Sequence, residues 1–110
     1  MIEKVEEYAF NGCHSLRGIK LPGVKIVERG AFHDCFGLEE IEFGDKLETI
    51  GHGAFESSSQ QKIKMPSVRF IEEWAFLDCE QLTELEFRDI ERIGQFAFNG
   101  CRRLRRMPSH

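Results

Sequence analysis

The sequence predicts an α/β solenoid: a right-handed coil with a short parallel sheet on one side and short helical or 3₁₀ turns on the other. Three observations lead to this prediction. The pair Ala-Phe recurs five times in 110 residues, at intervals of 22, 23, 21 and 22. A cysteine or serine follows three residues after each phenylalanine, and an apolar-x-apolar pair comes next. Such a period is typical of stacked coils, because one coil cannot bury its apolar side alone.

The Ala-Phe stretches, such as "EEYAFNG" and "EEWAFLD", are too short for a full helix. We expect each to form a single helical or 3₁₀ turn on the side opposite the sheet. The five pairs lie in one register, at Ala9-Phe10, Ala31-Phe32, Ala54-Phe55, Ala75-Phe76 and Ala97-Phe98.

The stretches "LRGIKL", "LEEIEF" and "LTELEF" have the form L-x-x-L-x-L. Alternate side chains of a short strand point to the same face, so these stretches predict one parallel sheet with leucine, isoleucine and phenylalanine turned inward. Between this sheet and the next Ala-Phe pair, "VKIV", "LETI", "VRFI" and "IERI" predict a second set of brief extended segments.

The pattern I-G-x-x-A-F-x-x-C-x-x-L-x-x-I-x-L-P is met here as "IGQFAFNGCRRLRRMP" and "VERGAFHDCFGLEEIEF". It resembles the BspA-like type of leucine-rich repeat, in about five 22-residue copies that cover the whole chain. The resemblance implies a noncatalytic role in protein interaction or scaffolding. The third copy departs from the pattern, with Ser58 in place of cysteine, Gln60 in place of leucine and one residue fewer before Ile63. We therefore expect the third coil to be the least stable.

The cysteines occupy one repeat position, which predicts a ladder of small, buried free thiols. A disulfide between neighbouring cysteines is an alternative, but parallel side chains give poor geometry for a bridge. Zinc bound by Cys13, His14, His33 and Cys35 is another, although the spacing is not compact and His14 should face outward. All four cysteines fit the ladder: Cys13, Cys35, Cys79 and Cys101.

We expect no catalytic site and no cofactor or metal. A catalytic cysteine needs an exposed thiol and a positioned base, whereas the four histidines do not recur in one repeat position. No paired carboxylates stand apart from the repeat, and no glycine-rich phosphate loop is present. We expect a protein that is not an enzyme; the alternative is a recognition segment of a larger multidomain enzyme.

Composition bounds the partners and the compartment. A formal charge of -4 and a pI near 5.6 argue against nucleic acid, whose phosphates need a basic surface. No apolar run approaches the roughly 20 residues that cross a bilayer, so membrane insertion is not expected. No secretory signal is visible at the start. The chain as given is expected in the cytoplasm, or at the cell surface, for example as an adhesin repeat, if it belongs to a longer exported protein.

Outward-facing charges alternate in sign from one coil to the next. On the first set of strands the sequence runs from Lys20 through an acidic and a basic coil to an acidic coil and Arg106. In a parallel sheet in register, each charge then lies between opposite charges. A second column does the same on the other extended segments, with Glu3, Lys25, Glu48, Arg69 and Glu91. We interpret both columns as a device that specifies the register.

Apolar residues at outward positions are the candidates for contact with a protein partner. Ile26 and Phe70 share a column with polar residues, and Phe36 stands where other copies are polar. Trp74 and Phe96 directly precede Ala-Phe, as Tyr8 does, and the alternative for these three is a cap over the core. Aromatic residues are enriched at interface hot spots, which favours five residues as partner contacts: Ile26, Phe36, Phe70, Trp74 and Phe96.

Residues 1–110 are expected to form a single domain of five coils. The chain starts and stops at the same phase of the repeat, and neither end carries an evident polar cap. Bare terminal coils expose core and strand edges. We therefore expect a fragment of a longer array, in which further repeats or another chain cover the ends.

Overall fold

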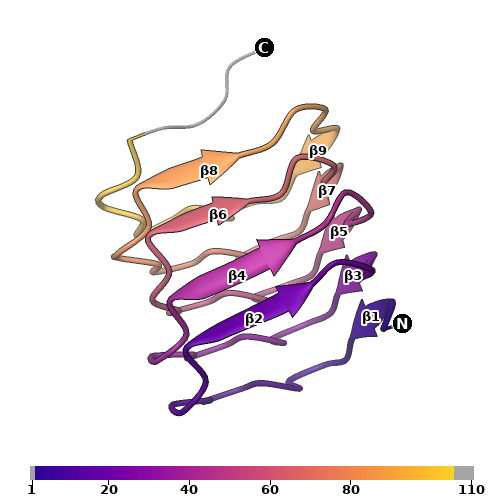
Figure 1. The fold of residues 1–110 in the computed structure, drawn as a ribbon. Helices are drawn as coiled ribbons and strands as arrows, with labels where there is room; N and C mark the ends of the chain where they lie inside the picture. The colour runs from indigo at the N-terminus through magenta and orange to yellow at the C-terminus, as the bar shows by residue number, and fades with distance from the viewer. Residues whose placement is uncertain (1, 106–110) are drawn as a thin grey trace.

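The computed structural model describes residues 2–105, which form a β-solenoid (Figure 1). Two parallel sheets make two sides of each coil, and turns make the third. The first sheet contains β2 (Gly18–Leu21), β4 (Glu40–Phe43), β6 (Lys62–Lys64) and β8 (Glu84–Glu86). The second contains β1 (Lys4–Val5), β3 (Ile26–Val27), β5 (Thr49–Ile50), β7 (Phe70–Ile71) and β9 (Arg92–Ile93).

Strand order in both sheets follows the repeat. The orders are β2-β4-β6-β8 and β1-β3-β5-β7-β9, so each strand pairs in parallel with the equivalent strand of the next coil. Ile19 lies opposite Ile41, and Ile63 lies opposite Leu85, at the same repeat position. Both predicted sets of extended segments are thus confirmed. The register keeps each apolar position of one coil on the same position of its neighbour, so the inward faces form one core.

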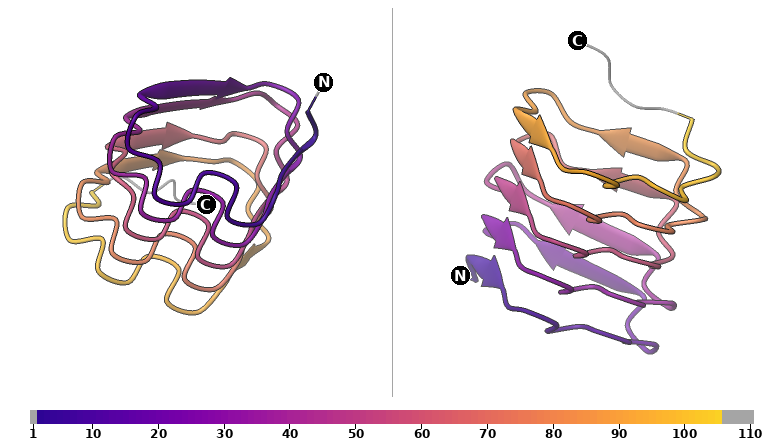
Figure 2. Two further views of the ribbon diagram at one scale, coloured as in Figure 1. Left: turned by 90° about the horizontal axis from the view of Figure 1, so that it is seen from below. Right: turned by 180° about the vertical axis from the view of Figure 1, so that it is seen from behind.

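The third side of the coil differs from the prediction. Residues 2–105 contain no α-helix and no 3₁₀-helix, so the expected helical turns around Ala-Phe are wrong. Each stretch is instead a chain of consecutive turns, seen along the solenoid as a regular wave (Figure 2, left). In the first coil, Ala9 N–H donates to Glu6 O at 3.1 Å, and Cys13 N–H donates to Phe10 O at 3.1 Å.

Two residues in each stretch have a positive φ, which stops a helix from continuing. In the first coil these are Tyr8 (φ 55°) and Gly12 (φ 70°), each the third residue of its turn, where a type II turn requires a positive φ. The N–H groups of Tyr8, Phe10 and Gly12 are then free to bond the next coil, and they donate to the carbonyls of Arg29, Ala31 and His33. A helix would use these donors within the stretch. Hydrogen bonds between coils therefore form in place of the hydrogen bonds of a helix.

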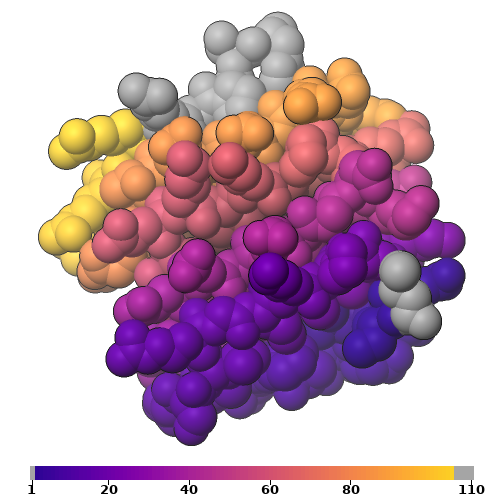
Figure 3. All heavy atoms as spheres, viewed as in Figure 1, coloured from indigo at the N-terminus to yellow at the C-terminus, as the bar shows by residue number. Residues whose placement is uncertain are grey.

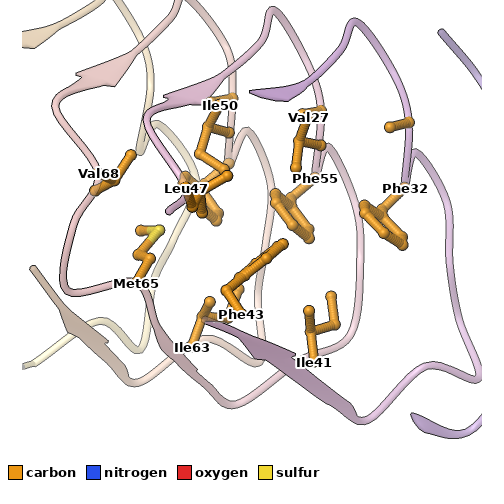
Figure 4. Close-up of a cluster of buried hydrophobic side chains, with 14 of the residues drawn as sticks. Val27, Phe32, Ile41, Phe43, Leu47, Ile50, Phe55, Ile63, Met65 and Val68 are labelled. Atoms are coloured by element: carbon orange, nitrogen blue, oxygen red, sulfur yellow. The ribbon is translucent and has the colours of Figure 1, made fainter. Parts of the chain in front are cut away.

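The core is built on a ladder of phenylalanine rings, one from each Ala-Phe pair. Phe55 is fully buried, and its ring lies parallel to Phe32 at 5.1 Å and to Phe76 at 5.2 Å between centroids. Phe43 reaches the same ring edge-on from the first sheet, at 6.4 Å. Figure 4 shows Phe32 and Phe55 stacked, with Ile41, Phe43 and Ile63 approaching from one side and Ile50 from the other.

The third coil keeps the core closed despite its departures from the repeat. Ser58 and Gln60 are buried, and Ser58 Oγ lies 2.7 Å from Gln60 Oε1. Gln60 Nε2 donates to Leu38 O in the preceding coil at 2.6 Å. In the described part of the chain, no buried side-chain nitrogen or oxygen lacks a hydrogen-bond partner. The amide thus takes the place of the leucine found in this column elsewhere.

Candidate functional site

The four cysteines lie at equivalent positions of the repeat and are not joined in disulfides. Cys35 and Cys79 are buried, Cys13 and Cys101 are half-buried, and all four are free. Cys35 Sγ donates to Phe10 O at 2.9 Å, and Cys79 Sγ donates to Phe55 O at 2.8 Å, each in the preceding coil. Burial raises the pKa of the Cys35 thiol to about 11, which keeps it protonated at neutral pH. Within residues 2–105, no three histidine, cysteine or acidic side chains could hold a metal ion.

Both charge columns lie in the predicted register. Lys20 faces Glu42, which faces Lys64, and Lys62 faces Glu84 with Nζ and Oε1 3.8 Å apart. Arg106 lies outside the described residues. In the second column, Lys25 pairs with Glu3 at 3.9 Å, and Arg69 pairs with both Glu48 and Glu91. Because opposite charges pair within each column, neither column presents an electrostatic field of one sign to a ligand.

Reversing the charge of Arg69 should destabilise the stack. An Arg69→Glu variant places three carboxylates in adjacent coils, and we expect a loss of about 1 kcal/mol in unfolding free energy at low salt. The loss should shrink in concentrated salt, where screening acts over a few ångströms. Urea unfolding at two ionic strengths measures it. Arg88→Glu is the matched control, because Arg88 is exposed and makes no ion pair within residues 2–105; an equal loss there would refute the column effect.

Phe70 and Ile26 lie two coils apart on the outer face of the second sheet, with Thr49 between them. The Phe70 ring is half-buried because two guanidinium groups cover it, Arg92 at 4.8 Å and Arg69 at 5.5 Å from its centroid. These cation–π contacts give the outward-facing Phe70 ring partners within the chain itself. Ile26 remains 39% exposed.

Phe36 lies at a different corner, in the bend that leads into β4 of the first sheet. Its side chain is 58% exposed and stacks on His14 of the preceding coil, with ring centroids 5.6 Å apart. It lines a groove of about 900 Å³ together with Ile19, Ile41 and the alternating charges of β2, β4 and β6. Figure 3 shows the side chains of these strands on the face turned to the viewer.

Trp74 and Phe96 form a ridge where the second sheet meets the turns. They lie in adjacent coils, joined by the bond from Trp74 N–H to Gln95 O at 3.2 Å. Their side chains are 46% and 58% exposed, and that of Tyr8 in the same column is 51% exposed. These rings therefore do not act as buried caps over the core. We call Trp74 and Phe96 the aromatic ridge.

The five predicted contact residues do not form one patch. Phe36 borders the groove on the first sheet, whereas Ile26 and Phe70 lie on the second sheet, and the aromatic ridge lies beside the turns. The backbone conformation of the aromatic ridge was not predicted from the sequence: Trp74 and Phe96 have positive φ values of 59° and 58°. A signal was present, because Gly30 and Gly53 occupy this column in the second and third coils.

Comparison with known families agrees with this geometry. In residues 2–105, no helix is long and apolar enough to cross a membrane. Comparisons with curated proteins and with solved structures gave no significant match. A family model described as "BspA type Leucine rich repeat region (6 copies)" matches residues 2–108, nearly the whole chain. The repeat spacing, the parallel strands and this match together show that the chain belongs to the BspA-type leucine-rich repeat family.

Proposed function

We propose that the chain is a noncatalytic protein-interaction module whose partner binds at the aromatic ridge. The observation that carries the proposal is the exposure of Trp74 and Phe96 at backbone positions that favour glycine. A bulky residue with a positive φ costs on the order of 1–2 kcal/mol relative to glycine. Rings that remain about half exposed recover only part of this through burial. A partner that covers both rings would supply the rest.

The remaining candidates support the ridge less strongly. Phe70 is covered by Arg69 and Arg92, and the charges around Phe36 pair among themselves along the sheet. Trp74 and Phe96, by contrast, expose aromatic side chains in adjacent coils, and aromatic residues are enriched at interface hot spots. The same surface would serve in a scaffold, in an adhesin or in the recognition segment of a larger enzyme.

The partner should be lost when the ridge is removed. In a Trp74→Gly/Phe96→Gly variant, glycine accepts the positive φ, so the fold should be kept while binding weakens by about tenfold or more. We would capture proteins from extracts of the source cells on the immobilised chain and on the variant, and then measure the affinity of each retained partner. Circular dichroism and urea unfolding check that the variant is folded.

Phe36→Ser is the matched control, since it removes an equally exposed aromatic ring from another corner. It should leave binding unchanged. Loss of the partner with Phe36→Ser but not with the ridge variant would move the site to the groove. Unchanged binding in both variants would contradict an aromatic interaction surface altogether.

We further propose that another coil, from the same or a different chain, pairs with the edges of the described stack. The edge of β1 offers unpaired backbone groups next to Glu3, and that of β9 offers them next to Glu91. Continuing the alternation calls for a basic residue opposite each of these carboxylates. Head-to-tail stacking of two copies would instead bring Glu91 against Glu3, so a coil of different sequence fits better.

A further inference from the structure

The turn side of the three middle coils has a large excess of negative charge. Residues 28–39, 51–61 and 72–83, which link the second sheet to the first, contain eight carboxylates, one arginine and no lysine. Their formal charge is -7 with histidine counted as neutral, whereas that of the whole chain is -4. Each of these coils has a neighbour on both sides in the described stack, so the excess does not depend on the terminal coils.

Two of these carboxylates lie close to Trp74 along the chain or across the coils, and each has only a histidine as its ion-pair partner. Glu73 directly precedes Trp74, and its Oε1 lies 3.8 Å from His52 Nδ1. Glu56, in the preceding coil, has its Oε2 3.6 Å from His33 Nε2. Histidine, unlike lysine or arginine, carries little positive charge at neutral pH. Within residues 2–105 neither carboxylate pairs with a lysine or arginine, so both can accept a cation from another molecule.

The surface next to Trp74 is bare at Gly53, the residue at the same repeat position in the preceding coil. The Gly53 N–H donates at 3.1 Å to the carbonyl of the residue before Trp74. In the second coil, the ring of Tyr8 lies over Gly30 and occupies the space of a side chain there. Gly53 has no such cover: outside the adjoining residues, the nearest atom to a Cβ placed on it would be Glu56 Oε1, at 3.3 Å. We call this bare position, bordered by a carboxylate, the Gly53 gap.

We propose that the partner bound at the aromatic ridge is a basic protein segment, one of whose lysine or arginine side chains enters the Gly53 gap. The inference rests on the function proposed above and adds the chemistry of the partner. A cation in the gap would lie next to the Glu56 carboxylate, and an exposed aromatic ring such as that of Trp74 attracts cations as well. Other basic residues of the segment would face the remaining carboxylates of the turn side, whereas an acidic segment would be repelled.

The fluorescence of Trp74 reports on this surface directly, because Trp74 is the only tryptophan of the chain. The folded 110-residue protein is titrated at low salt with an oligoarginine peptide, and with an oligoglutamate peptide of the same length to test the sign of the charge. We expect a saturable change of Trp74 emission with oligoarginine and none with oligoglutamate. A change with both peptides, or with neither, would overturn the inference.

A pair of matched variants locates the cation. Glu56→Gln/Glu73→Gln removes both carboxylates beside the gap and keeps Trp74, so the affinity for oligoarginine should fall about tenfold. Asp45→Asn/Asp89→Asn changes the net charge equally, at exposed residues on a different corner that make no ion pair within residues 2–105. This control should change the affinity by less than about twofold. Equal losses in the two variants would show that binding follows net charge alone and would refute a site at the gap.

Two further measurements keep the outcome clear. If circular dichroism shows that the double variant has lost its fold, Glu73→Gln alone should weaken oligoarginine binding about threefold, and an unchanged affinity would contradict the inference. The capture experiment described above separates this inference from the proposed function. A partner that is lost with Trp74→Gly/Phe96→Gly but bound equally by Glu56→Gln/Glu73→Gln would keep the aromatic ridge as the binding site and exclude a basic side chain in the Gly53 gap.

Discussion

Replacing Phe55 by alanine should cost about 3–5 kcal/mol of unfolding free energy, the largest loss that we expect from any single core substitution. Its ring has no exposed surface and touches stacked rings on both sides and Phe43 at the edge. Truncation removes these contacts and leaves a cavity in the middle of the stack. Because each coil is stabilised mainly by its neighbours, the defect weakens the coils on both sides of it. Urea unfolding monitored by circular dichroism measures the loss.

Phe98→Ala is the matched control for the ladder. Phe98 is half-buried and stacks within residues 2–105 on Phe76 alone, at 5.4 Å between centroids. Its truncation should cost roughly half as much as that of Phe55. A loss at Phe98 equal to that at Phe55 would show that stacking from both sides does not set the stability of the core.

Gln60→Ala should produce the second largest loss, about 2–4 kcal/mol. The variant opens a cavity in the leucine column and removes the amide that donates to Leu38 O at 2.6 Å. Ser58 Oγ would lose its contact to Gln60 Oε1 but keep its bond to Phe55 O. Leu38 O would keep only the longer bond from Ser59 Oγ at 3.3 Å, so the loss combines the cavity with a weakened buried hydrogen bond.

The neighbouring residue provides the comparison for Gln60. Gln61 has the same side chain, but it is exposed, so Gln61→Ala should change stability by less than about 0.5 kcal/mol. Equal effects of the two substitutions would mean that the amide in the leucine column contributes nothing specific. Such a result would also support the expectation that the third coil is the weakest of the stack.

The sequence was sufficient to predict the strands and their register. Paired apolar residues such as Ile19 and Leu21 recur every coil, and alternation along a strand leaves only one choice for the inward face. The cysteine ladder followed from the same recurrence. Alternating charges at Lys25, Glu48 and Arg69 gave independent support, because only the observed register brings opposite signs together.

The turn side and the location of the contact residues could not be predicted in the same way. Short apolar stretches suit a helical turn as well as a chain of β-turns, and the choice depends on hydrogen bonds to the next coil. Aromatic residues such as Trp74 give no local indication of a positive φ; only their alignment with Gly30 and Gly53 does. Likewise, the cover over Phe70 comes from Arg92, one coil away.

Hydrogen bonds join neighbouring coils on all three sides: within both sheets and from the turn N–H groups of Tyr8, Phe10 and Gly12. All of them run along the solenoid, while the covalent backbone runs around it (Figure 2, right). A pull on the two ends of the stack is therefore borne by these hydrogen bonds and by apolar contacts, one junction after another. The covalent backbone carries that tension only after the hydrogen bonds of a junction have broken. We therefore expect the stack to unfold one coil at a time under force.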